Sequence, residues 1–103
     1  MANINQMMKQ AQQMQAKMAT LQKELETREF ESSTGGGMVN VKVNGKQELL
    51  DITIDKEVVD PNDVEMLQEL VKTAINQAMK ESQDSVQNAM SKVTGGLSIP
   101  GLF

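Results

Sequence analysis

Apolar residues near the N-terminus repeat at alternating intervals of three and four residues, the spacing that one face of a long helix requires. The repeat consists of Ile4, Met7, Ala11, Met14, Met18, Leu21 and Leu25, here called the N-terminal seam. It predicts a helix over residues 1–27, beginning near Asn3 and about 35 Å long at 1.5 Å per residue. A helix with such a seam must pack it on another apolar surface, and this requirement constrains the fold most.

The same stretch carries positive charge in an acidic protein. Residues 1–23 contain three lysines and no acidic residue, whereas the 103-residue chain has a formal net charge of −4. At about 100° per residue, Lys9, Lys17 and Lys23 fall on the side opposite the seam. One face can therefore pack on protein while the other meets an anionic partner. We include Gln13 as a candidate contact residue, although glutamines equally suit a solvated surface.

After residue 27 the apolar pattern changes from helical to alternating. Val39, Val41 and Val43 form one face of a strand, and Phe30 lies in a shorter strand before it. Asn44-Gly45 is a strong hairpin signal and predicts a two-residue type I′ turn, in which both residues have positive φ. That turn would pair Val43 with Lys46, Val41 with Glu48 and Val39 with Leu50. The sequence thus predicts a three-stranded antiparallel meander over residues 28–55, with Leu50, Ile52 and Ile54 on the valine side.

A second helical region is expected over residues 60–94. Asp60 suits the N-cap, Pro61 suits the first helical position, and Gly95-Gly96 ends the helix. The apolar pattern weakens at Ser82 and Ser85, where the helix is expected to bend, restart or project. Residues 95–103 form an apolar tail that either packs in a groove of this protein or its partner or serves as a partner-binding tag. The predicted fold is a single α+β domain over residues 1–103, in the order α-β-β-β-α.

The N-terminal seam is too long for the sheet of one chain. A strand of about seven residues spans about 23 Å, less than the length of the predicted first helix. Part of the seam must therefore find another apolar surface, and a symmetric partner supplies one most simply. The expected assembly is an intertwined homodimer from which the helices project.

The composition argues against catalysis. The chain has no Cys, His, Tyr or Trp, so the commonest proton shuttle and the best nucleophile are missing. Gly35, Gly36 and Gly37 lack the phosphate-loop pattern and are read as a strained turn or close packing, with a ligand role as the alternative. We expect no catalytic residue, no cofactor and no metal. No apolar run approaches the roughly 18–20 residues of a membrane span, so a cytoplasmic protein without a membrane partner is expected.

Several short motifs follow one another in the order of a known bacterial family. They are Met8–Met14, Gly35–Val39, Asn44-Gly45, Glu48-Leu49, Val59–Pro61, Asp63–Leu67, Ala74–Ala78 and the ending Pro100–Phe103. No single motif is specific, but the ordered set covers nearly the whole chain and resembles the YbaB/EbfC family.

The resemblance implies a nucleoid-associated homodimer that binds double-stranded DNA with little sequence specificity and without a cofactor. Lys9 and Lys17 match the basic positions of the family's first-helix motif, whereas Lys23 lies beyond its clearest part. Some relatives carry a long Gly/Met-rich leader before that motif, and we do not expect a DNA contact of that kind here. The alternative hypothesis is an adaptor for replication or recombination proteins that does not bind DNA. A membrane-surface role for the first helix ranks third, because such helices usually carry more cations and bulkier apolar anchors.

Overall fold

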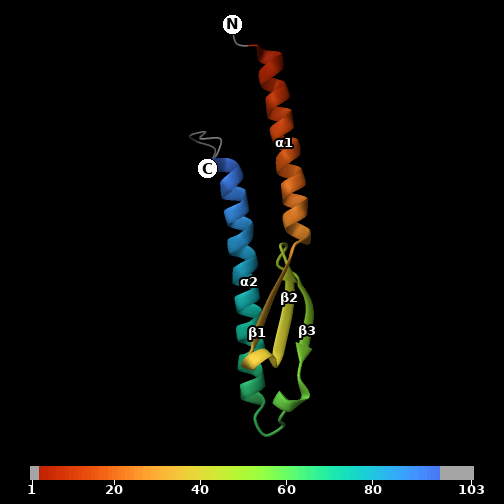
Figure 1. Cartoon of the computed structure of the whole chain (residues 1–103), viewed down its shortest axis with the longest axis vertical. Coiled ribbons are helices and arrows are strands. Elements are labelled where there is room, and N and C mark those ends of the chain that lie inside the picture. Colours follow the sequence, from red (N-terminus) through yellow and green to blue (C-terminus); the bar gives the residue numbers. More distant parts are fainter. Residues whose placement is uncertain (1–2, 96–103) are drawn as a thin grey trace.

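The computed structural model describes residues 3–95 of the chain. Its elements are α1 (Ile4–Thr27), β1 (Glu29–Thr34), β2 (Val39–Asn44), β3 (Leu49–Ile54) and α2 (Val64–Gly95), with short 3₁₀ turns at Gly35–Gly37 and Lys56–Val58. The predicted α+β fold and its α-β-β-β-α order are therefore confirmed. The molecule is elongated, 76 × 21 × 16 Å, because α1 and the second half of α2 extend past the sheet (Figure 1).

The core lies between α2 and one face of the sheet. The strands are antiparallel in the order β1-β2-β3, as predicted, and α2 packs mainly on β1 and β2. The predicted valine face is confirmed, since Val39, Val41 and Val43 are buried together with Phe30. Ala74 and Ala78 of α2 pack against them, and their small side chains allow the helix to approach the sheet closely.

The pairing of β2 with β3 differs from the predicted register by three residues at Val43, which lies opposite Leu49, and by four residues over the rest of the strand. Val41 lies opposite Ile52, where Glu48 was predicted, and Val39 lies opposite Ile54. The shift at these two valines is even, so both isoleucines still lie on the valine side. They nevertheless remain 39% and 37% exposed. Because α2 packs on the other two strands, this chain covers the apolar face of β3 incompletely.

The hairpin forms at the predicted place, but the predicted type I′ turn is wrong. The Gln47 N–H donates to the Asn44 carbonyl (3.1 Å), and the Asn44 N–H donates to the Glu48 carbonyl (3.1 Å). Gln47 has a φ of 67°, whereas Gly45 is not among the residues with positive φ. The loop is thus a three-residue connection ending in a left-handed residue. Residue 45 is glycine for a different reason, because a Cβ atom there would overlap the carbonyl oxygen of Leu25.

Each helix begins where a side-chain oxygen accepts a hydrogen bond from a backbone N–H of its first turn. Asn3 caps α1 by accepting a hydrogen bond from the Gln6 N–H (3.4 Å), which agrees with the predicted start. The predicted cap of α2 is wrong, because the Asp63 carboxylate accepts from the Met66 N–H (3.2 Å). Asp60 instead caps a separate turn, in which its carbonyl accepts from the Asp63 N–H (3.0 Å). This turn delays the helix by three to four residues.

Helix α2 runs through Ser82 and Ser85 without interruption. The apolar pattern weakens there because Ser82 makes polar contacts with the hairpin. Ser82 is fully buried; its hydroxyl donates to the Asn44 carbonyl (2.8 Å) and accepts from the Gln47 side-chain amide (2.8 Å). The serine thus joins α2 to the hairpin. The apolar tail beyond Gly95 lies outside the described residues.

Candidate nucleic-acid interface

The predicted contact residues all belong to α1, the helix that extends away from the sheet (Figure 1). Lys9, Gln13, Lys17 and Lys23 are all exposed. By contrast Leu25, two residues beyond Lys23, is 2% exposed, since it marks the place where α1 meets the hairpin. The helix is therefore anchored near its C-terminal end and presents its basic residues to solvent.

The three lysines of α1 are not neutralised within the described part of the chain. The ion pairs found there involve Lys42, Lys46 and Lys72. No acidic residue precedes Glu24 in the sequence. At 1.5 Å per residue, Lys17 lies about 12 Å from Lys9 and about 9 Å from Lys23 along the helix axis. These spacings provide a row of separate positive charges for an extended anionic surface.

The prediction that all three lysines lie opposite the seam is wrong for Lys17. Lys17 lines a shallow groove together with Leu21, a member of the N-terminal seam. At about 100° per residue it lies about 90° from the centre of the seam, at its edge rather than opposite. Lys9 and Lys23 lie opposite the seam, so the two form the outward basic face. Gln13 falls between the outward face and Lys17.

One further lysine near α1 was not identified from the sequence. Lys46 lies at the tip of the hairpin, and its Nζ is 3.9 Å from a carboxylate oxygen of Glu26. The contact between Gly45 and Leu25 brings this hairpin tip to the end of α1. Since that contact joins residues far apart in the sequence, no local pattern could have placed Lys46 beside the helix.

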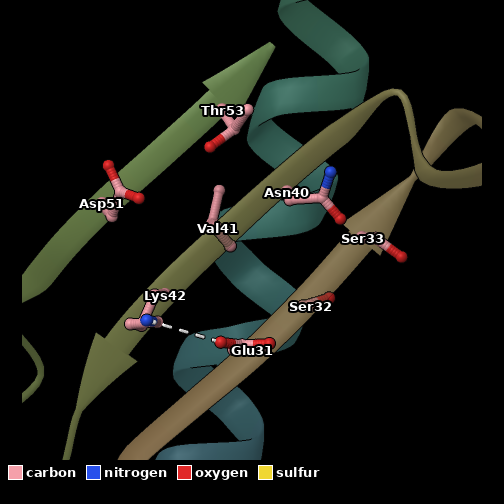
Figure 2. Close-up of a pocket in the computed structure, with 8 residues that line it drawn as sticks. All are labelled: Glu31, Ser32, Ser33, Asn40, Val41, Lys42, Asp51 and Thr53. Atoms are coloured by element: carbon pink, nitrogen blue, oxygen red, sulfur yellow. Dashed lines mark ion pairs between the residues drawn. The ribbon is translucent and has the colours of Figure 1, made fainter. Parts of the chain in front are cut away.

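The outer face of the sheet carries a polar hollow of about 410 Å³, on the side away from α2 (Figure 2). Its lysine, Lys42, lies 3.6 Å from Glu29 and 3.5 Å from Glu31. The charges of Glu29 and then Glu31 raise the pKa of Lys42 above its usual value of 10.5. Asp51 also lines the hollow. Carboxylates therefore outnumber the single ammonium group, and the hollow does not suit an anionic ligand.

The N-terminal seam is exposed at its start, at Ile4, Met7 and Ala11, and half-buried at Met14, Met18 and Leu21. Ile4 and Met7 are 70% and 60% exposed, and Met8 beside them is also exposed. Leu25 is the residue of α1 that the body of the protein buries. The N-terminal seam and β3 thus both expose apolar side chains that a second protein surface could bury.

Residues 3–95 contain no group of three or more metal-ligating side chains placed to share an ion. They also contain no helix with the length and apolar character needed to cross a bilayer.

Comparisons with known proteins agree with the geometry. Over 101 residues the chain is 56% identical to a nucleoid-associated protein of Clostridium novyi, covering 98% of this chain and 89% of the relative. It is also 56% identical to a nucleoid-associated protein of Desulforamulus reducens, covering 98% and 96% of the two chains. The crystal structure of an uncharacterized protein from Helicobacter pylori superimposes with a TM-score of 0.75 at 26% identity, covering 91% of this chain and 99% of that one.

The family model for the YbaB/EbfC DNA-binding family matches residues 1–97. This match covers both helices and the sheet. It therefore includes the core and the projecting part of α1 that carries Lys9, Lys17 and Lys23, here called the basic arm. The resemblance inferred from the short motifs is thereby confirmed. The chain belongs to the YbaB/EbfC DNA-binding family.

Proposed function

We propose that the chain binds double-stranded DNA as a homodimer and contributes to nucleoid organisation or gene regulation. The observation that carries the proposal is the row of exposed, unneutralised lysines on the projecting part of α1. Family membership supports DNA as the partner, and the nucleoid-associated relatives support a location in the nucleoid. Nothing in the family match favours the adaptor hypothesis, in which the protein binds no DNA.

The contacts are made mainly to the phosphate backbone. Lysine ammonium groups carry charge to phosphates without reading base identity, so they position the protein without specifying a sequence. Lys9 and Lys23 supply the outward face, and Lys17 supplies a lateral contact. Gln13 lies between these positions and adds a hydrogen-bonding group. No residue set on α1 matches the base-reading offsets of a recognition helix, so sequence preference is low.

The homodimer is supported by two exposed apolar surfaces. The N-terminal seam and the inward side of β3 both carry large apolar side chains that this chain leaves exposed. Pairing with a second copy would remove both from water, at about 25 cal/mol per Å² of apolar area. The dimer also brings two basic arms to one duplex, doubling the number of lysines from three to six.

Net acidity keeps the binding modest. The chain carries 14 acidic and 10 basic residues, and Lys72 of α2 is paired with Glu69 at 3.5 Å. The acidic residues, all at position 24 or beyond, therefore repel DNA as it approaches α1. Counterion release from the duplex supplies most of the affinity, and this contribution falls steeply as salt increases.

The test is a salt titration of DNA binding by the purified protein. A random-sequence duplex of about 30 base pairs is titrated across a salt series, and log K is plotted against log salt concentration. Contacts by all six lysines of a dimer give a slope of about −5, which is the upper limit. A slope of several units supports the proposal. Absence of binding at low salt would overturn it and redirect the search to protein partners.

A further inference from the structure

A small groove lies at the point where α1, the hairpin and α2 meet. It has a volume of about 240 Å³, and its lining includes Gln22, Leu25, Glu26, Lys46, Val86 and Met90. Beyond this point both helices continue past the sheet (Figure 1). The groove is thus bounded on one side by the anchored end of α1 and on the other by the last part of α2.

The lining suits an extended apolar peptide. Val86 and Met90 of α2 are half-buried and supply most of the apolar surface, and Leu25 of α1, which is 2% exposed, lies beneath it. Glu26 and Lys46 form an ion pair at the edge (3.9 Å), and Gln22 is exposed. A groove with an apolar floor and a polar rim can bury apolar side chains of a peptide, while polar groups at the rim can form hydrogen bonds with the peptide backbone.

We propose that residues 97–103 of the same chain occupy this groove. The segment contains Leu97, Ile99, Leu102 and Phe103, and no charged side chain. It follows Gly95 and Gly96, and glycine is the residue that most readily ends a helix and reverses the chain. These apolar side chains match the apolar walls of the groove, and the neutral segment carries no charge into it.

The length of the segment fits the distance to the groove. Met90 lies five residues before Gly95, or about 7.5 Å along the axis of α2, and Val86 lies about 6 Å further. Seven extended residues span about 23 Å. A segment that turns back after Gly96 therefore brings Ile99 level with Met90, and Gly101 level with Val86. Residues 97–103 are long enough to pass both walls.

A seated segment would tie α1 to α2. The groove has walls from both helices, so its occupant contacts the anchored end of the basic arm and the C-terminal part of α2 at once. It would thereby fix the direction in which α1 projects. The inference does not depend on DNA binding, because occupancy of the groove and retention of DNA are measured separately.

Disulfide cross-linking tests the proposal in the full chain, which has no native cysteine. The test chain carries Val86→Cys and Gly101→Cys, a pair that keeps all four apolar side chains of the segment. The matched control carries Gln87→Cys and Gly101→Cys, since Gln87 is exposed and about 100° around the helix from Val86. The rate of disulfide formation within one chain is measured by the loss of free thiol and by electrophoretic mobility.

A seated segment closes the Val86 pair at least about tenfold faster than the Gln87 pair, because seating raises the effective concentration of one thiol at the other. Equal rates would overturn the proposal. Mixing chains that carry Val86→Cys alone with chains that carry Gly101→Cys alone is expected to give little cross-linked product. Rapid cross-linking in that mixture would show the segment of a second copy in the groove and would also overturn the proposal.

A second pair covers the case in which Val86→Cys disturbs folding. Gln22→Cys lies on the α1 wall, and Gln22 is already exposed, so the substitution removes little packing. Paired with Gly101→Cys, it is expected to close faster than the Gln87 control by a similar factor. Failure of this pair in a folded chain would count against the segment lying in the groove.

Discussion

Gly45 of the hairpin lies directly against the carbonyl oxygen of Leu25, with no room for a side chain between them. This contact sets where α1 leaves the body of the protein. Replacing Gly45 with Ala places a Cβ atom on that carbonyl, and the helix or the hairpin must move. We expect a loss of about 2 kcal/mol or more in the free energy of unfolding, measured by urea denaturation.

Gly36→Ala is the control for this substitution. Gly36 has a φ of +68°, but a Cβ atom there meets no other atom within 4 Å. Alanine at this position therefore bears only the strain of the left-handed conformation, about 1–2 kcal/mol. A smaller effect for Gly45→Ala than for Gly36→Ala would refute the close contact with Leu25.

Ser82→Ala tests the link between α2 and the hairpin. The substitution removes the hydroxyl that joins the Gln47 side-chain amide to the Asn44 carbonyl, and it leaves the amide without that partner. The Asn44 carbonyl keeps the hydrogen bond from the Gln47 N–H. We expect α2 to remain helical and the free energy of unfolding to fall by about 1–3 kcal/mol. Ser85→Ala, three residues along the same helix, is the matched control and is expected to change stability by less than about 0.5 kcal/mol.

The outward basic face of α1 is tested by replacing Lys9 and Lys23 with Gln in one chain. A dimer then loses four positive charges, and the slope of log K against log salt is expected to become less steep by about 3–4 units. The matched control, Lys56→Gln with Lys72→Gln, makes the same change in net charge away from α1. Equal effects of the two double variants would show that net charge, rather than α1, governs DNA binding.

Ile52→Gln tests the role of β3 in the proposed homodimer. Ile52 is 39% exposed on the inward side of the sheet, and glutamine there would place a polar group in the dimer contact. We expect the dimer dissociation constant to rise at least about tenfold, equivalent to about 1.4 kcal/mol, in sedimentation equilibrium. Thr53→Gln, on the outer side of the same strand, should leave the dimer unchanged. An unaltered dimer in the Ile52 variant would exclude β3 from the interface.

The elements of this fold could be predicted from the sequence because each has a local signal. Helical and alternating spacing located both helices and the valine strand, and Asn44-Gly45 located the hairpin. The reason for glycine at position 45 could not be predicted in this way, because the atom that excludes a side chain there belongs to the backbone of Leu25, twenty residues earlier. The register shifted for a related reason. The three-residue loop moves the partner of Val43 from Lys46 to Leu49, and a bulge between Lys42 and Val43 adds one further residue, so backbone geometry rather than side-chain pattern decided which residues face each other.

The candidate interface was predictable to a different degree. No Asp or Glu precedes Glu24, so the sequence offers the lysines of α1 few carboxylates with which to form ion pairs. The structure shows these lysines exposed. The position of Lys17 at the edge of the seam follows from helical geometry alone, whereas the position of Lys46 beside α1 required the hairpin contact. Charge patterns along one helix can be read directly, whereas the groups that other elements bring to that helix cannot.

Because α1 is anchored only near its C-terminal end, a small change in its tilt moves its N-terminal end by a larger distance. Lys9 lies 16 residues before Leu25, which is about 24 Å of helix. A tilt of about 10° at the anchored end therefore displaces Lys9 by about 4 Å, while Lys23 scarcely moves. Small differences in packing beside Gly45 are thus amplified at the tip of the arm.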